Sequence, residues 1–579
     1  MEKPPVQRRI LRNKLYLYVT EFFAGMAVMA VELGASRLLA PYFSSSQIVW
    51  TIIIATIMIA MALGNVYGGR SADRDPDPAK LYRRLLIASV WIAMIPVLGK
   101  YLILGITGLL VVTVSMNLLI IAAFLACMVI FVFPCFLLGT CTPSLIRFTV
   151  SGADDSGRTA GTLGACNTAG SIIGTFLPTF VTIPAVGTAV TFLIFSGVLL
   201  VIALLYFLSP YEEGTGNSGA DHGPRGKGTG NGGGADRSAS SGGRQQGTGG
   251  AESAKDSRRF SAGCATAVLL FLLATIFGNN DSFAFWEKDL TYEGESVYNY
   301  LQVRDTPAST ILSTNVLFGV QSVTMKDNSL TGMYYDYAMA APLMAERAEK
   351  MLILGMGTGT YARQCLRYFP SMKIRGVEID EKITMLADKY FDAPAEAEVI
   401  NYDGRAYLDA DPETYDVIMV DAYQDITIPF QMSSSEFFSS VRAHLSEGGV
   451  MVVNMNMRSS AEDGINTFLS DTIAGVFPYV TYADVSGSTN RVLFASVSPG
   501  WEENFAAHLE KTEAANLVNL LENVRTKLQT YEGGDHILTD DKAPVELLGM
   551  RAIDEIIAAE LGYYKEVFRR DGIRGLLGA

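Results

Sequence analysis

The stretch that decides the fold is KMLILGMGTGT, residues 350–360, in which an apolar run leads directly into Gly355, Gly357 and Gly359. Glycine permits a tight turn and lets backbone N–H groups approach a ligand closely. A helical pattern follows at 361–369, so the segment has the strand–turn–helix layout of a nucleotide-binding loop. A glycine-rich turn can also be mere packing, and the flanking sequence has to distinguish the two.

That flanking sequence alternates between strand and helix patterns. Strands are predicted at 350–354, 373–379, 397–400, 416–420 and 450–454, with two late strands near 480–483 and 492–496. Such alternation implies a parallel sheet. Five parallel strands with a late antiparallel hairpin predict a Rossmann-like domain of the methyltransferase type. We place it at 326–550, after a small β-subdomain at 285–325 (strands at 298–303, 310–313 and 316–320) and before a helical tail at 551–579.

Acidic residues end several of these strands. Glu378 ends the second strand, about 20 positions after the glycine loop, where a carboxylate can accept hydrogen bonds from ribose hydroxyls. Asp403 and Gly404 follow the third strand, and the Asp403 carboxylate could hold an adenine amino group. Asp421 follows the fourth. One such side chain could be a helix cap, but together they predict a nucleotide site at the carboxyl edge of the sheet.

The first half of the chain has a different composition. Charged residues make up 18% of the chain, against roughly a quarter in soluble domains, and the deficit lies in residues 1–208. Since a bilayer core needs about 20 apolar residues per helix, we predict a transmembrane helical domain of six spans. The spans are 15–40, 48–68, 85–106, 118–140, 159–183 and 188–208. Glycines within 161–174 are expected to permit close helix packing.

Basic residues set the expected orientation. They cluster at the N-terminus, within 70–84, and at Arg147 and Arg158, so the positive-inside rule places the N-terminus in the cytoplasm. A Gly/Ser-rich flexible linker, 209–261, precedes a seventh apolar segment at 262–278 of marginal length. If that segment spans, the second half lies outside the cell. The supply of adenosyl donors instead favours the cytoplasm, which requires 262–278 to lie at the interface or 109–114 to help form an extra span.

Composition also excludes some classes. The net charge of −14 argues against nucleic-acid binding, which needs a basic face. The chain has six cysteines without a CxxC pair and four histidines, none near another potential ligand in sequence, so no metal site is predicted.

Several motifs together resemble the polyamine aminopropyltransferases (spermidine synthases), particularly the bacterial form fused to a membrane domain. The motifs in the second half are ESVYNYLQV (295–303), LFGVQS (317–322), YYDYAMAAPL (334–343), VEID (377–380), YDG (402–404), YDVIMVDAYQDITIPF (415–430) and LTDDKAPVELL (538–548). In the first half, VELGASRLLAPYF (31–43) and GGRSADR (68–74) resemble the fused members.

This resemblance implies transfer of an aminopropyl group from decarboxylated S-adenosylmethionine to a polyamine such as putrescine. A neutral amine must attack the carbon next to the sulfonium, so a carboxylate that takes its proton is required. By family position that base is Asp421; the alternative is that Asp421 only caps the following turn.

The resemblance also assigns the remaining site residues. Acceptor binding is expected from Asp336, Asp425, Tyr335, Tyr423 and Gln321, and donor binding from Gly355, Gly357, Thr358, Gly359, Glu378, Asp403, Gly404 and Asn299.

One departure leaves alternatives open. Thr358 stands where the family has the Asp that holds the donor's ammonium, so GMGTGT is closer to a methyltransferase loop. The alternatives are therefore an S-adenosylmethionine-dependent methyltransferase, or a transporter or sensor whose nucleotide-binding domain is catalytically inactive. The bundle could be a transporter-like half, a bilayer anchor or a platform for homo-oligomers.

Overall fold

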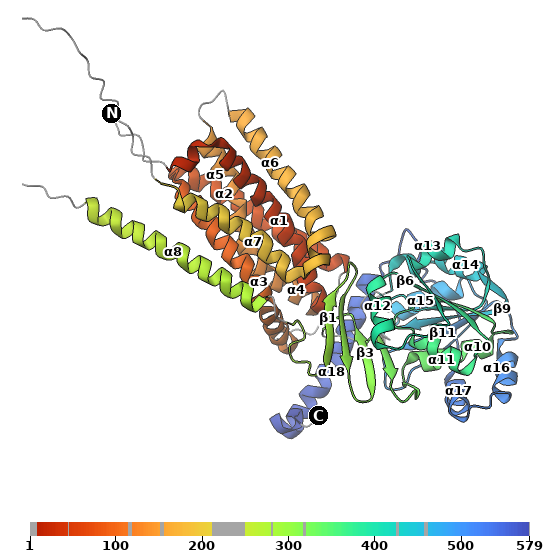
Figure 1. Ribbon diagram of the computed structural model, residues 1–579. Helices are drawn as coiled ribbons and strands as arrows, with labels where there is room; N and C mark the ends of the chain where they lie inside the picture. The colour runs from red at the N-terminus through yellow and green to blue at the C-terminus, as the bar shows by residue number, and fades with distance from the viewer. Residues whose placement is uncertain are drawn as a thin grey trace, which may run out of the picture.

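The computed structural model consists of a helical bundle and an α/β domain, with a small sheet between them (Figure 1). It describes residues 8–43, 46–113, 118–150, 156–210, 249–278, 282–316, 320–423, 428–456 and 461–577.

The bundle is built from apolar helices. They are α1 (Lys14–Phe43), α2 (Gln47–Arg74), α3 (Pro78–Thr113), α4 (Leu118–Gly139), the short α5 (Cys141–Thr149), α6 (Ser156–Leu177) and α7 (Ile183–Leu208). In the described part of the chain, five helical segments are long and apolar enough to cross a membrane. The fifth, Ser156–Leu208, contains both α6 and α7.

These two helices run in opposite directions along α1. Gly170 and Gly174 of α6 lie against the backbone of Phe22 and Met26, with no room for a side chain, so α6 is parallel to α1. On α7, the Ile202 carbonyl instead accepts a hydrogen bond from the Tyr16 hydroxyl at 2.7 Å, near the start of α1, whereas the Phe192 ring packs on Gly34, further along it. The reversal follows the left-handed backbone of Gly187 (φ 79°).

The seventh apolar segment is part of α8 (Gly249–Gly278), which packs along α3 and α7 (Figure 1). Its Phe271 ring contacts Gly197 of α7, and Gly278 lies beside Pro96 and Val97 of α3. Residues 109–113 are the last turn of α3 and form no separate helix. Residues 262–278 therefore lie alongside two of the apolar helices, and residues 109–113 continue one of them.

The small sheet is antiparallel, in the order β1–β2–β3–β4. Its strands are β1 (Leu290–Glu295), β2 (Tyr300–Asp305), β3 (Ser309–Ser313) and β4 (Ser322–Met325). A strand is also predicted at 316–320, but neither of its two described residues, Val316 and Val320, belongs to a strand. The Val316 N–H instead donates to the Pro41 carbonyl of α1 at 2.9 Å. Residues 317–319 lie outside the described residues. The first strand, β1, was not predicted.

The α/β domain has an eight-stranded sheet in the order β12–β10–β11–β9–β8–β5–β6–β7. Its parallel strands are β5 (Lys350–Leu354), β6 (Lys373–Glu378), β7 (Glu398–Asn401), β8 (Tyr415–Val420) and β9 (Leu445–Met455). β10 (Tyr479–Asp484), β11 (Arg491–Ser496) and β12 (Gln529–Thr530) are antiparallel. The predicted Rossmann-like fold of the methyltransferase type is confirmed.

Helices cover both faces of this sheet, and each face has its own buried apolar cluster. The helices are α9 (Tyr334–Ala338), α10 (Ala341–Met344), α11 (Thr360–Tyr368), α12 (Glu381–Tyr390), α13 (Gly404–Ala410), α14 (Ser435–Ala443), α15 (Ile465–Ala474), α16 (Trp501–Glu510), α17 (Ala515–Lys527) and α18 (Val545–Leu577). Strand order reverses between β5 and β8, and such a switch point is where open α/β sheets bind ligands.

Candidate active site

The glycine loop between β5 and α11 forms the floor of a pocket. Gly355, Gly357 and Gly359 all have positive φ (94°, 56° and 76°), which other residues rarely adopt. A side chain at Gly355 would clash with the backbone carbonyl of Asp421. Glycine at this position therefore lets the ends of β5 and β8 approach each other.

Glu378 lies at the end of β6, beside the glycine loop. One carboxylate oxygen accepts a hydrogen bond from the Gly357 N–H at 2.8 Å, and the other accepts from the Asp380 N–H at 3.1 Å. Burial raises the pKa of Glu378 to about 7, although both hydrogen bonds favour the ionised form. The carboxylate lines the pocket and keeps lone pairs for a ligand hydroxyl.

Asp421 follows β8, on the other side of the switch point. Its Oδ1 accepts a hydrogen bond from Asn454 Nδ2 at 2.8 Å, and its Oδ2 accepts one from the Tyr334 hydroxyl. Asn454 is fixed in turn by Asn490, whose Nδ2 donates to Asn454 Oδ1 at 2.9 Å. Burial is the largest influence and raises the pKa of Asp421 to about 7, and the nearby Glu378 carboxylate raises it further.

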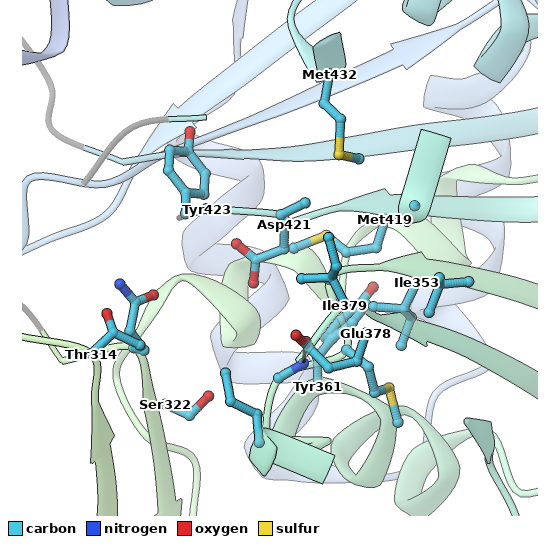
Figure 2. Close-up of a pocket in the computed structure, with 18 of the residues that line it drawn as sticks. Thr314, Ser322, Ile353, Tyr361, Glu378, Ile379, Met419, Asp421, Tyr423 and Met432 are labelled. Atoms are coloured by element: carbon cyan, nitrogen blue, oxygen red, sulfur yellow. Dashed lines mark hydrogen bonds between the residues drawn. The ribbon is translucent and has the colours of Figure 1, made fainter. Parts of the chain in front are cut away.

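The pocket joins the small sheet to the α/β domain. In Figure 2, Asp421 lies between Tyr423 and Glu378. Thr314 and Ser322, of the small-sheet region, lie at the lower left of the view. Apolar side chains, including Ile353, Met419 and Met432, line the space around them (Figure 2). Most of the predicted site residues line this pocket: Asn299, Gln321, Tyr335, Gly355, Gly357, Glu378, Asp403, Gly404, Asp421 and Tyr423.

Four predicted residues do not line it or cannot be placed. Thr358 is buried with its hydroxyl 3.1 Å from that of Thr360, and Gly359 faces Pro394 and Ala393 instead of the pocket. Asp336 is buried away from the pocket and accepts hydrogen bonds from Thr331, Gln364 and the Gly332 N–H (3.0, 2.8 and 2.6 Å). Its carboxylate thereby closes the turn before α9. Asp425 lies outside the described residues.

One of the predicted strand-end carboxylates, Asp403, does cap a helix. Asp403 Oδ1 accepts a hydrogen bond from the Ala406 N–H at 2.8 Å, which makes Asp403 the N-cap of α13. Asp403 also lines the pocket, so one side chain orders the helix and faces the ligand space. Asp421 accepts no hydrogen bond of this kind from the following turn among the described contacts.

Sequence reasoning missed two side chains that donate hydrogen bonds to Asp421. Tyr334 belongs to the quoted motif at 334–343, from which only Tyr335 and Asp336 are assigned to acceptor binding. The neighbouring Tyr335 hydroxyl accepts from the Val323 N–H at 2.8 Å. Asn454 sits near the end of β9, and the same strand-end criterion that selected Glu378 could have selected it. Within the described residues, no group of three or more His, Cys, Asp or Glu side chains could hold a metal ion.

Comparison with known proteins agrees with this architecture. A sequence model of the spermine/spermidine synthase domain matches residues 333–486. The chain is 56% identical over 333 residues to a probable polyamine aminopropyl transferase of Bifidobacterium longum, covering 55% of this chain and 75% of that protein. It is 26% identical over 303 residues to the polyamine aminopropyltransferase of Vibrio vulnificus, covering 48% and 98%.

A solved spermidine synthase in complex with the transition-state analogue AdoDATO is 21% identical and covers 39% of this chain and 80% of that one, with a TM-score of 0.34. The relationship to the Bifidobacterium protein covers three quarters of that relative at high identity. The chain is a transferase and belongs to the polyamine aminopropyltransferase (spermidine synthase) family.

Proposed function

We propose that this chain is a membrane-bound aminopropyltransferase that moves an aminopropyl group from decarboxylated S-adenosylmethionine to a polyamine such as putrescine. The observation that carries the proposal is Asp421, a carboxylate at the β8 end of the pocket, beside the glycine loop and within the same cavity as Glu378. Its pKa of about 7 suits a general base, because about half of such groups are ionised at neutral pH and the group still holds a proton well.

The reaction needs a neutral amine nitrogen. As that nitrogen attacks the carbon bound to the sulfonium, a C–N bond forms, the C–S bond breaks and the sulfur leaves with its electron pair as a neutral thioether. The nitrogen then carries one proton too many, and Asp421 accepts it. The hydrogen bonds from Tyr334 and Asn454 hold the carboxylate in one orientation for that transfer.

The nucleoside half of the donor is assigned to the β6–β7 side of the pocket. Glu378 would accept hydrogen bonds from the ribose hydroxyls and Asp403 one from the adenine amino group. Ile379, Ile383 and Met432 provide the apolar surface that a purine ring requires.

For the acceptor, we propose that Tyr335 and Tyr423 flank the methylene chain and that Gln321 and Asp425 bind its far end. Tyr423 suits this role because its hydroxyl is fixed, donating to the Asn454 carbonyl at 2.7 Å and accepting from the Asn456 N–H at 3.0 Å. Asp336 is left out of the acceptor site, since its oxygens already accept three hydrogen bonds outside the pocket.

The test is a transfer assay with purified full-length protein. Decarboxylated and intact S-adenosylmethionine are each offered with putrescine, spermidine and longer amines, and products are identified by mass. Aminopropyl transfer from the decarboxylated donor is expected. Methyl transfer from the intact donor would instead support the methyltransferase reading, which the neutral Thr358 favours. Binding without turnover of either donor would support the regulatory reading.

We also propose a placement in the membrane. Arg8 lies at the end of the bundle where α7 finishes, bonded to the Phe207 and Ser209 carbonyls at 2.5 and 2.7 Å. The catalytic domain meets the opposite end, where Gln47 N–H donates to Glu546 and Lys100 donates to the Ser282 carbonyl, both at 2.7 Å. Since the basic clusters accompany the N-terminal end, the positive-inside rule favours a cytoplasmic N-terminus and a catalytic domain on the other face. This proposal differs from the cytoplasmic placement expected from donor supply.

A further inference from the structure

The turn between β1 and β2, residues 296–299, links the membrane bundle to the donor side of the pocket. It is a tight turn: the Ser296 N–H donates to the Asn299 carbonyl at 2.8 Å, and the Ser296 hydroxyl accepts from the N–H groups of Tyr298 and Asn299 at 3.1 and 2.9 Å. Tyr298 and Asn299 both line the pocket. The position of this turn therefore shapes the ligand space.

On the membrane side, Arg37 of α1 binds the turn. Its Nη1 donates to the Ser296 carbonyl at 3.1 Å, and its Nη2 donates to the Val297 carbonyl. A guanidinium is a planar fork of donors, so it can hold two successive carbonyl groups in one fixed orientation. Within the sequence, these partners lie 259 and 260 residues away from Arg37, so the contact joins the two halves of the protein.

On the catalytic side, Asp380 binds the same turn. One oxygen, Oδ2, accepts hydrogen bonds from the Ser296 hydroxyl at 2.6 Å and from Asn299 Nδ2 at 2.9 Å. The Asp380 N–H in turn donates to Glu378 at 3.1 Å. The turn is thus held between a membrane helix and the segment that orients Glu378.

A second membrane helix holds the residue just before the turn. Glu295 accepts hydrogen bonds from the Thr188 N–H at 3.0 Å and the Thr188 hydroxyl at 2.8 Å. The Thr188 N–H is available because the backbone of Gly187 breaks α7 there, and a carboxylate is a favourable partner at such a restart. A polar cavity lined by Ser36, Arg37 and Trp50 lies beneath the turn and shares Tyr298, Asn299 and Thr314 with the active-site pocket.

We infer that Arg37 is a positioning residue for the adenosyl donor: it fixes the 296–299 turn so that Tyr298 and Asn299 close the nucleotide side of the pocket. Donor affinity consequently depends on the placement of α1 relative to the catalytic domain. This inference rests on the proposed function for the identity of the ligand as an adenosyl compound.

The test uses the full-length chain in detergent or nanodiscs and three variants. Arg37→Met removes the guanidinium N–H groups that bind the turn but keeps an apolar side chain of similar length. Arg37→Lys keeps a charge that can hold one carbonyl. Glu546→Gln weakens a different contact between bundle and catalytic domain, the one to the Gln47 N–H, far along the chain from the turn.

Arg37→Met is expected to raise the KM for the adenosyl donor and the Kd for the nucleoside 5′-methylthioadenosine by about tenfold, because binding must then order a turn that Arg37 no longer holds. The kcat at saturating donor and the KM for the amine should stay within about twofold of wild type. Arg37→Lys should recover part of the loss, and Glu546→Gln should leave nucleoside affinity unchanged.

Two results would overturn the inference. One is a 5′-methylthioadenosine Kd within about twofold of wild type in Arg37→Met. The other is a parallel change in which kcat and melting temperature fall and both KM values rise, because that pattern indicates a general folding role. If no variant, nor the wild type, transfers an aminopropyl group while nucleoside binding still depends on Arg37, the proposed reaction fails and the positioning role stands.

Discussion

The hydroxyl of Tyr334 donates a hydrogen bond to the Asp421 carboxylate across 87 residues of sequence, joining the start of α9 to the end of β8. A hydrogen bond to the ionised form of an acid lowers its pKa, and this one acts against the burial that raises the pKa of Asp421 to about 7. The hydroxyl therefore increases the fraction of the Asp421 carboxyl group that is ionised at neutral pH.

The first prediction concerns this contact. Tyr334→Phe removes the donor, so the pKa of Asp421 should rise and the acidic limb of the kcat/KM profile should move to higher pH. A charge-assisted hydrogen bond contributes about 1.5–3 kcal/mol, which corresponds to a shift of about one to two pH units. Rates measured between pH 6 and 10 provide the check.

The matched control for that change is Tyr335→Phe. The Tyr335 hydroxyl accepts a hydrogen bond from the Val323 N–H and makes no described contact with Asp421. Its loss should leave the acidic limb in place. Equal shifts in the two variants would mean that ring packing, rather than the Tyr334 hydrogen bond, controls the profile.

The second prediction concerns donor binding through Glu378. Glu378→Ala leaves the Gly357 N–H and the ribose hydroxyls without their acceptor, so affinity for 5′-methylthioadenosine should fall by about 1–3 kcal/mol. Calorimetry on the full-length protein measures this directly. Glu413→Ala, an exposed carboxylate paired with Lys350 on the same domain, should bind as wild type does. Unchanged affinity in Glu378→Ala would remove Glu378 from the donor site.

The strands and the residues at their ends show how much of the fold can be predicted from the sequence. Apolar runs bounded by glycine or acidic residues located β5 to β9, because buried parallel strands leave a strong periodic signal. The same strand-end criterion identified Glu378, Asp403 and Asp421, since parallel strands bring their carboxyl ends to one edge. The other predicted residues that line the pocket came from the glycine loop (Gly355 and Gly357) or from the family resemblance (Asn299, Gln321, Tyr335 and Tyr423).

The misses have a common physical reason. Which of two adjacent tyrosines meets Asp421 depends on the helical phase of α9, and a five-residue helix leaves no periodicity to read. Asp336 resembles a substrate ligand by position, yet tertiary packing turns it toward Gln364. The contact of Val316 with Pro41 could not be foreseen, because it joins segments separated by the whole membrane half.

The third prediction uses Thr358 to identify the donor. Thr358→Asp places a negative charge beside Thr360, which lines the pocket, whereas Thr358→Asn has the same shape without the charge. Relative to Thr358→Asn, Thr358→Asp should bind decarboxylated S-adenosylmethionine about tenfold more tightly, because the new carboxylate can pair with the ammonium of this donor. It should bind the intact donor more weakly, because only the intact donor has a carboxylate that the new charge repels. Tighter binding of the intact donor would contradict both enzyme readings. Melting curves of both variants control for the cost of burying a charge.

The fourth prediction concerns the two ends of the bundle. Arg12 and Glu503 are both exposed, the first beside the start of α1 and the second on α16 of the catalytic domain. In a chain whose native cysteines are replaced, Glu503→Cys should react with a membrane-impermeant maleimide on intact cells. Arg12→Cys should react only after permeabilisation. The reverse pattern would place the catalytic domain in the cytoplasm, against the charge distribution; reaction of both on one face would contradict the bundle geometry.

The last prediction is that Asp421 acts in the chemical step and is not needed for folding. Asp421→Asn keeps the size of the side chain and an oxygen for one of its two donors, Tyr334 or Asn454, but it cannot take a proton from the amine. Turnover should fall by roughly 10²–10⁴-fold, the range typical of losing a general base. Donor affinity and melting temperature should change little. In the wild type, protonation of the carboxylate, whose pKa is about 7, should lower the rate by a further factor of about ten per pH unit below pH 7, on top of the loss of neutral amine. That limb should disappear in Asp421→Asn, and its residual rate should instead rise with pH as more amine becomes neutral.

Asp416→Asn is the control: Asp416 lies at the other end of β8, where it accepts hydrogen bonds from the N–H groups of Glu349 and Lys350 at 2.9 and 3.1 Å. It should lower the melting temperature while leaving the pH profile intact. Full aminopropyl transfer by Asp421→Asn would show that another group, or water, accepts the proton.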